Sequence, residues 1–205
     1  MVYMRPVTSI LLINGHQPFP TSPGKLNQAF CDRAQTHFEA DGATVRQVRT
    51  AEPWDLEREV ENQLWADLIF LQFPLNSMGL PWSLKRYLDE VYTAGMDGRL
   101  ARGDGRTRKD PSQQYGSGGK LEGKRYMLSV TLNAPRAAFN DPTQPLFAGR
   151  SLDELLAPVQ INFAFFALSP LPTFAAHDVS KAPQIAADFD RFDAHLKAHA
   201  SDFGS

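Results

Sequence analysis

The clearest indication of the fold comes from positions 10–27, which read Ile-Leu-Leu-Ile-Asn-Gly-His-Gln-Pro-Phe-Pro-Thr-Ser-Pro-Gly-Lys-Leu-Asn. Its first four residues are continuously apolar, which is typical of a strand buried on both faces of a parallel sheet. A polar loop follows, and apolar residues then recur at helical spacing until Asp41 and Gly42 supply a stop; these positions are Leu26, Phe30, Ala34 and Phe38. The chain therefore opens with a strand, a loop and a helix.

The same alternation continues along the rest of the chain. We expect further strands at 45–48, 68–71, 126–130 and 170–174, the first of them more polar and so near a sheet edge. Helices are expected after Pro53, from about 79–81, over 152–166, and at the end of the chain, where Ile185, Phe189, Phe192 and Leu196 mark one face. Alternating strands and helices predict a parallel sheet covered by helices on both faces, in a single domain over 1–205.

Composition excludes several classes of protein. With 205 residues, 42% of them hydrophobic, the chain can form a sizeable core. Twenty-one basic against 23 acidic residues leave a net charge of −2, which argues against a dedicated binder of nucleic acid or of anionic membranes. The chain has no apolar run long enough to cross a membrane and no apolar signal core at its start, so we expect a cytoplasmic protein. Its single cysteine, Cys31, is expected to pack in a helix, and no metal site is expected.

Residues 95–124 are the exception to the regular pattern. This stretch is rich in glycine and charged residues, shows no periodicity, and is too long for a simple connecting loop in a compact domain. We therefore expect either a functional lid, which we favour, or local disorder. Its basic residues either receive the phosphates of a pyridine dinucleotide or are simply solvated; they are Arg99, Arg102, Arg106, Arg108 and Lys109.

Three loops follow the carboxyl ends of expected strands, where open parallel sheets bind ligands. In the first, at 14–27, free backbone N–H groups at the helix start would favour a phosphate, with Ser22 and Asn27 as further donors. The alternative is that Ser22 only caps the helix. This loop matches neither a Walker loop nor the Rossmann glycine fingerprint.

The second loop, at 73–81, combines a tight backbone path with Asn76, Ser77 and Met78, and such a loop suits the edge of a flat heteroaromatic ring. The third, at 131–135, offers the Thr131 hydroxyl and the Asn133 amide. An ordinary turn is the alternative for each loop.

Together these segments resemble the flavodoxin-like NAD(P)H:quinone reductases, and most closely their modulator of drug activity B group. The resemblance runs from residue 10 to about 177. Its most specific motifs are Leu-Trp-Ala-Asp at 64–67, Gly-Leu-Pro-Trp at 79–82, Asp-Gly-Arg-Thr-Arg-Lys-Asp-Pro-Ser at 104–112, Tyr-Gly-Ser-Gly-Gly at 115–119 and Pro-Leu-Pro-Thr-Phe at 170–174.

The resemblance implies a flavodoxin-like, doubly wound sheet of five parallel strands in the order 2-1-3-4-5, a bound FAD, and two-electron, ping-pong reduction of quinones by NAD(P)H. It also implies a homodimer with active sites at the subunit interface, which the aromatic stretch at 163–166 favours. Contacts to FAD would fall on Ser22, Pro23, Gly24, Lys25, Leu26, Asn27, Gln28, Ala29, Leu75, Asn76, Ser77, Met78, Tyr115, Thr131, Leu132, Asn133 and Ala134. Tyr115 is also the candidate to help protonate the quinol, a task that solvent could perform equally well.

One departure concerns the second loop, where this chain has Leu75, Asn76 and Ser77 in place of the bulky aromatic residues common in that group, so we expect an altered acceptor pocket. An azo- or nitro-compound reductase therefore stays open as an alternative, as does a flavodoxin-type electron carrier.

Several other residues have two interpretations each. His16 either reaches the flavin diphosphate or is solvated, and Trp65 and Trp82 belong to the core or to an interface. The clustered phenylalanines either wall an acceptor pocket or belong to the core or a dimer interface; they are Phe139, Phe163, Phe165 and Phe166.

Overall fold

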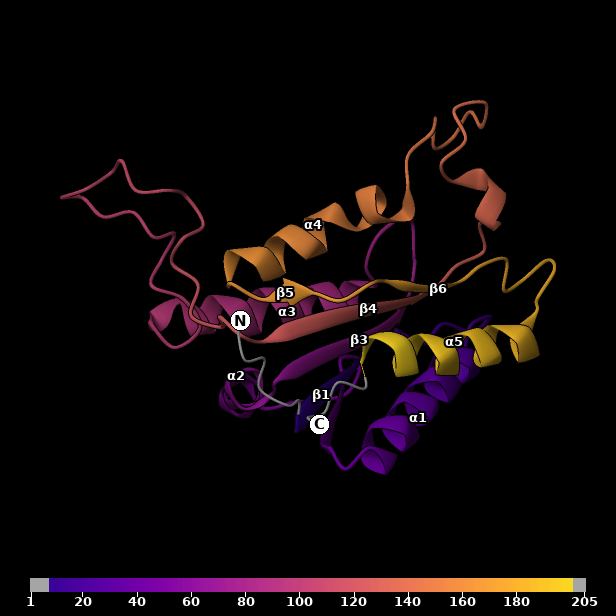
Figure 1. Cartoon of the computed structure of the whole chain (residues 1–205), viewed down its shortest axis with the longest axis horizontal. Helices are drawn as coiled ribbons and strands as arrows, with labels where there is room; N and C mark the ends of the chain where they lie inside the picture. Colours follow the sequence, from indigo (N-terminus) through magenta and orange to yellow (C-terminus); the bar gives the residue numbers. More distant parts are fainter. Residues whose placement is uncertain (1–7, 201–205) are drawn as a thin grey trace.

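The computed structural model describes residues 8–200, and a parallel sheet lies at its centre (Figure 1). The strands are β1 (Ser9–Asn14), β2 (Thr44–Arg49), β3 (Leu68–Pro74), β4 (Arg125–Thr131), β5 (Ser169–Pro170) and β6 (Phe174–Ala176). They lie in the order β2-β1-β3-β4-β5, with β6 also paired to β4, and every pairing is parallel. The predicted strand order and the edge position of the polar strand are both confirmed.

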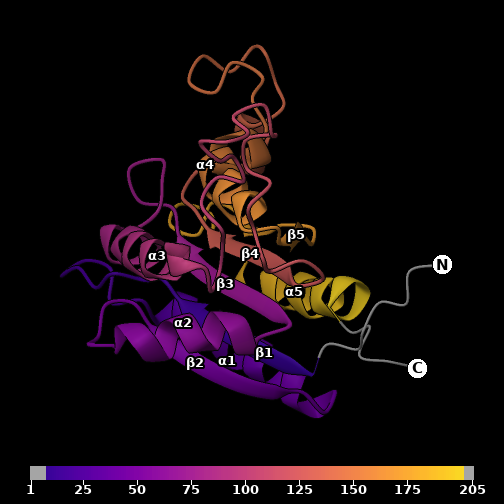
Figure 2. The same cartoon turned by 90° about the vertical axis from the view of Figure 1, so that its left-hand side faces the viewer.

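Helices cover both faces of this sheet. Leu11 and Ile13 of β1 pack into one core with α2 (Leu56–Trp65), α3 (Trp82–Ala94) and α4 (Leu152–Phe165). Ile10 and Leu12 point the other way, toward α1 (Lys25–Ala40) and α5 (Ile185–His199). Figures 1 and 2 show α3 and α4 on one side of the sheet and α1 and α5 on the other. Because both faces are buried, the strand has no polar alternation.

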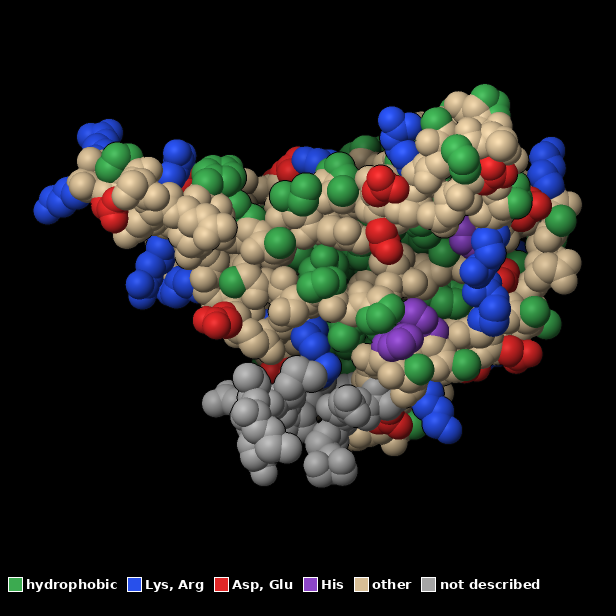
Figure 3. Space-filling model, turned by 45° about the horizontal axis from the view of Figure 1, so that its top comes forward, with side chains coloured by type: hydrophobic (Ala, Val, Ile, Leu, Met, Phe, Trp, Pro, Cys, Tyr) green, Lys and Arg blue, Asp and Glu red, His purple; other side chains and the backbone are tan. Residues whose placement is uncertain are grey.

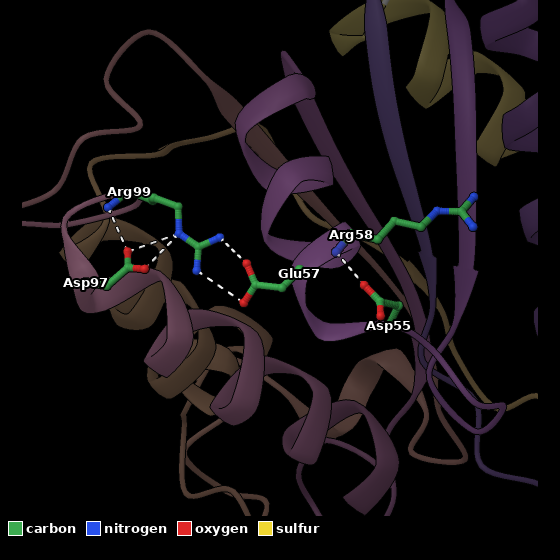
Figure 4. Close-up of polar contacts among 5 residues, drawn as sticks. All are labelled: Asp55, Glu57, Arg58, Asp97 and Arg99. Carbon is green, nitrogen blue, oxygen red and sulfur yellow. Dashed lines mark hydrogen bonds and ion pairs between the residues drawn. The ribbon is translucent and has the colours of Figure 1, made fainter.

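The expected elements form, with corrections at some of their ends. Helix α2 begins at Leu56 and not at Pro53, because the Asp55 side chain accepts a hydrogen bond from the Arg58 N–H at 2.8 Å (Figure 4). The strand expected at 170–174 is divided into β5 and β6 and runs on to Ala176, since Pro172 has no N–H to donate to a neighbouring strand.

Trp82 is not a core residue: it begins α3 and is 60% exposed. Trp65 is half-buried beneath the Arg46 guanidinium, which lies 4.0 Å from the ring centroid. Phe139, Phe163 and Phe166 are buried in the core, whereas Phe165 is only partly buried. The aromatic stretch at 163–166 is therefore mostly core and does not by itself indicate an interface.

The long segment between α3 and β4 protrudes from the body of the protein (Figure 1). After the short helix η1 (Gly95–Asp97), the chain pairs with itself through Arg102 N–H to the Gly118 carbonyl at 2.8 Å. We call the projecting residues 102–118 the arm. Its base is held by Arg99, which contacts Glu57 of α2 at 2.6 Å and Asp97 at 2.9 Å (Figure 4).

These pairings change the interpretation of the basic run. Arg99 is already engaged with two carboxylates, and Arg106 with Asp104 at 2.6 Å. Basic side chains nevertheless gather at the outer end of the arm (Figure 3). A dinucleotide phosphate would therefore have to meet Arg102, Arg108 or Lys109, or displace a carboxylate.

Within residues 8–200, no helix has the length and apolar character needed to span a bilayer. The same residues hold no group of three or more His, Cys, Asp or Glu side chains placed to bind a metal. Cys31 lies in α1 and is fully buried in the core, as predicted, and burial raises the pKa of its thiol.

Candidate functional site

The three loops at the carboxyl ends of β1, β3 and β4 enclose a common pocket of about 520 Å³. It is lined by His16, Thr21, Ser22, Pro23, Gly24, Lys25, Leu26, Asn27, Pro74, Leu75, Asn76, Thr131, Leu132, Asn133, Val179 and Ser180. The structure thus brings together most of the candidate residues from all three loops. We call this the loop pocket.

The first loop is folded on itself before α1 begins. Phe19 and Ser22 exchange backbone hydrogen bonds of 3.1 and 2.9 Å across a tight turn. The His16 ring is buried beneath this turn, and its Nε2 donates to the Ser22 carbonyl at 3.1 Å. Burial lowers the pKa of His16, which favours the neutral form of the ring. His16 is therefore a packed support of the loop, and the interpretation of a solvated histidine is wrong.

Gly24 closes the loop in a conformation that suits glycine. Its φ is +82°, in the left-handed region, and a Cβ placed there would lie 2.4 Å from the His16 ring. The close approach of His16 and the left-handed backbone both require glycine at this position.

Helix α1 starts without a side-chain cap. Gly24 is the N-cap residue, no side chain accepts from the first turn, and that turn holds no acidic residue. The alternative that Ser22 caps the helix is therefore wrong. Uncapped N–H groups and the positive end of the helix dipole then face the loop pocket, which Gly24, Lys25 and Asn27 line. Such a helix start favours an anion, above all a phosphate.

Asn27 has a structural role in addition to the one expected of it. Its side chain is buried, donates to Asn14 Oδ1 at 2.7 Å and accepts from Gln72 Nε2 at 3.0 Å. Gln72 in turn accepts from the Ser129 hydroxyl at 2.6 Å. This network joins α1 to β1, β3 and β4 directly beneath the loop pocket. The Asn27 amide therefore holds the strand ends together beside the loop pocket, and its expected contact with a phosphate stays a prediction.

The second loop contains a two-residue turn with a strained backbone. Asn76 and Gly79 exchange backbone hydrogen bonds of 3.0 and 2.9 Å, and between them Ser77 and Met78 have φ values of 49° and 65°. Turns of this kind normally use Asn-Gly, and side chains other than glycine cost about 1–2 kcal/mol per residue there. Strain of this kind accumulates at ligand sites, where the surroundings hold it in place.

The third loop leaves β4 beside the second. Leu75 N–H donates to the Thr131 carbonyl at 2.9 Å, and Leu132 N–H to the Ala176 carbonyl at 3.0 Å. Thr131 and Leu132 are buried, whereas the Asn133 side chain is exposed at the pocket rim. Ala134 does not line the pocket, and its carbonyl contacts the His177 ring at 3.3 Å.

Tyr115 is placed apart from the other candidates. It lies on the arm, is 67% exposed, and its ring contacts Phe165 at the end of α4 with centroids 5.7 Å apart. Figure 1 shows the arm at the end of the sheet where β4 begins, whereas the three loops follow the strands at the opposite end of the sheet. Tyr115 therefore does not share the loop pocket of its own chain.

Sequence reasoning missed Val179 and Ser180, which line the loop pocket from the segment between β6 and α5. Val179 N–H donates to the Leu132 carbonyl at 3.2 Å, so this segment continues beside the third loop. Nothing in the local sequence indicates this contact. The candidates Gln28 and Ala29 instead line a second pocket of about 470 Å³ on the β2 side of the first loop, which Pro23, Gly24 and Lys25 also line.

Known proteins resemble this chain over most of its length. The family model described as flavodoxin-like fold matches residues 8–200. An uncharacterised protein of Schizosaccharomyces pombe is 46% identical over 86% of this chain and 89% of the relative. The NADPH:quinone oxidoreductase MdaB of Haemophilus influenzae is 38% identical over 92% of this chain and 97% of its own length.

A solved structure supports the fold. General stress protein 14 of Treponema denticola, determined in complex with FMN, has a TM-score of 0.63 and 22% identity, over 93% of this chain and 98% of the other. The strand order, the loops at the carboxyl edge and the family match agree with one another. The chain belongs to the family of proteins with the flavodoxin-like fold.

Proposed function

We propose that the protein is a flavin-dependent NAD(P)H:quinone oxidoreductase that binds FAD in the loop pocket. The observation that carries the proposal is the uncapped start of α1, which faces a pocket shared by three loops. The likeness to NADPH:quinone oxidoreductase MdaB, over nearly the whole of both chains, supports the choice of reaction.

The residues of the loop pocket fit a flavin nucleotide. The backbone of Gly24, Lys25 and Leu26 at the helix start would hold the phosphates, with the Lys25 ammonium adding positive charge. Asn76 lines the pocket from the strained turn, in which the N–H groups of Ser77 and Met78 are not used by the turn's own pair of backbone bonds. Thr131 and Leu132 close the pocket from β4.

FAD is our assignment over FMN, and it rests on the resemblance to the modulator of drug activity B group, which implies FAD with contacts at 22–29 and 131–134. A flavin bound in the loop pocket would supply the transfer of a hydride from NAD(P)H to a quinone in a ping-pong sequence, a chemistry that needs no protein nucleophile. The chain's own contribution is to bind the phosphates, to orient the ring against a rigid turn, and to hold the three loops in register through Asn27 and Gln72.

Releasing the bound cofactor by heat tests this assignment. The purified protein is expected to be yellow, with a flavin spectrum and the mass of FAD in the released fraction. A colourless protein would contradict flavin binding, and the mass of FMN would contradict FAD.

We further propose a homodimer in which the arm of one copy brings Tyr115 to the flavin of the other. Helix α4 is apolar around most of its circumference, yet Ile161 on it is 67% exposed, and Trp82 of α3 is 60% exposed. Exposed apolar side chains on neighbouring helices are typical of a surface that a partner covers. A second copy would also explain why Tyr115 lies at the opposite end of the sheet from the loop pocket of its own chain.

Light scattering is expected to give about 46 kDa, twice the 22.8 kDa of one chain. Ile161→Asp should shift the mass to that of one chain, because the new carboxylate would have to be buried in the interface. A mass of one chain for the parent protein across micromolar concentrations would contradict the dimer.

A further inference from the structure

Another pocket, separate from the one that Gln28 and Ala29 line, lies on the other side of the strained turn from the loop pocket. It has a volume of about 360 Å³ between α3 and α4, and it is lined by Met78, Gly79, Leu80, Lys85, Leu88, Asp89, Leu155, Leu156, Pro158, Val159 and Asn162. We call it the α3–α4 pocket. Asn76, the other end of the turn, lines the loop pocket, so the width of one turn separates the two.

Proline 158 gives a physical reason for this pocket. It lies in the interior of α4, where it cannot donate the helical hydrogen bond to the Glu154 carbonyl and its ring crowds that carbonyl. Proline at such a position disturbs the helix and the packing of the turn around it. Pro158 itself lines the pocket, next to Leu155 and Val159.

The pocket has an apolar wall and no net charge. Leu80, Leu88 and Leu156 contribute aliphatic surface, and its charged members, Lys85 and Asp89, pair with each other at 2.6 Å. A volume of this size, with mostly apolar lining and few polar groups, suits a small uncharged organic molecule.

The side-chain amide of Asn162 contains a donor that no other group of the described residues accepts from. Its Nδ2 is enclosed and has no hydrogen-bond partner among the described residues. Leaving such a donor unpaired costs about 1–3 kcal/mol. Asn162 also lines the pocket, and the torsion that orients its amide is broad, so the amide can rotate to meet a ligand.

We propose that the α3–α4 pocket is a subsite for the electron acceptor, that it takes an uncharged, apolar ring bearing a carbonyl oxygen, and that Asn162 sets this preference by donating to that oxygen. The inference rests on the proposed function, because it names the class of acceptor for the same site. The second copy of the proposed dimer would close the open side of the pocket.

Asn162→Leu tests the donor, and Gln160→Leu is its matched control. Gln160 carries the same type of amide on α4, but it does not line the pocket and donates to Asp153 at 3.0 Å. With NAD(P)H as donor, kcat/KM is measured for 2-methyl-1,4-naphthoquinone and for ferricyanide, which has no carbonyl and is charged. Asn162→Leu should lower the naphthoquinone value about tenfold or more, mainly through KM, and leave the ferricyanide value within about twofold. Gln160→Leu should change neither.

Two further readouts separate a ligand role from a structural one. Because the unpaired amide destabilises the protein without ligand, Asn162→Leu should raise Tm by about 2–4 °C. The redox-inert ketone 1-tetralone should shift the Asn162 side-chain amide signal in the NMR spectrum of the parent holoenzyme. If Asn162→Leu fails to fold, Leu155→Phe takes its place as the test. This substitution narrows the pocket and should lower kcat/KM for the naphthoquinone but not for ferricyanide.

The proposal is overturned if tetralone leaves the Asn162 signal unchanged. It is also overturned if Asn162→Leu lowers kcat/KM equally for both acceptors or lowers it for neither. Failure of the proposed function looks different: neither acceptor would then oxidise NAD(P)H in the parent, whereas tetralone would still bind.

Discussion

Gly24→Ala is expected to weaken flavin binding about tenfold to a hundredfold. The new Cβ would lie 2.4 Å from the His16 ring, and the backbone there has a φ of +82°. His16 cannot easily move aside, because it is buried and bonded to the Ser22 carbonyl. Relieving the clash must therefore shift the start of α1 or the first loop. We expect this shift to weaken the free energy of flavin binding by about 1–3 kcal/mol.

Gly42→Ala is the matched control at the other end of α1. Gly42 has a nearly identical φ of +85°, but a Cβ there meets nothing within 4 Å. It should cost about 1 kcal/mol of stability and leave flavin affinity unchanged. Titrating FAD into the stripped variants, with fluorescence quenching as the signal, gives the Kd values. Equal affinity in the two variants would contradict the role of the Gly24–His16 contact, and adding His16→Ala to Gly24→Ala should restore part of the loss.

Asn27→Leu is expected to lower the free energy of unfolding by about 2–3 kcal/mol, which corresponds to about 4–12 °C in Tm. Leucine has nearly the same volume, but it leaves Gln72 Nε2 without its acceptor and removes a donor from Asn14 Oδ1. Both groups are buried, so water cannot replace the lost partner.

Denaturant unfolding of the protein stripped of cofactor distinguishes this role from phosphate binding. Gln35→Leu is the control on the same helix. The Gln35 amide donates to Glu39 at 2.8 Å in a solvent-accessible position, so the substitution should change stability by less than about 0.5 kcal/mol. If Asn27→Leu leaves the stripped protein as stable as the parent and lowers only flavin affinity, Asn27 binds the cofactor and the network is not what matters.

The sequence predicted the parts of the fold that follow from local pattern. The apolar runs in β1, β3 and β4 and the 3.6-residue spacing in α1 and α5 are local signals, and each matched an element of the structure. The order of the strands followed from the resemblance of the motifs, because no local pattern specifies which strands become neighbours.

The candidate site was predicted less completely, for reasons of the same kind. The positions of the three loops follow from where strands end, but the partners of individual side chains depend on residues far away in the chain. Asn27 is the clearest case, since its acceptor and donor lie on two different strands. The burial of His16 and the placement of Tyr115 at the opposite edge likewise follow only from the packed structure.

Anaerobic half-reactions of the purified holoprotein, with no partner protein present, distinguish a quinone reductase from an electron carrier. We expect NAD(P)H to bleach the flavin absorbance and a stoichiometric amount of quinone then to restore it, which requires a reductase that handles both substrates itself. An electron carrier would remain oxidised in the presence of NAD(P)H. That result, or a bleached protein that quinone fails to reoxidise, would contradict the proposed function.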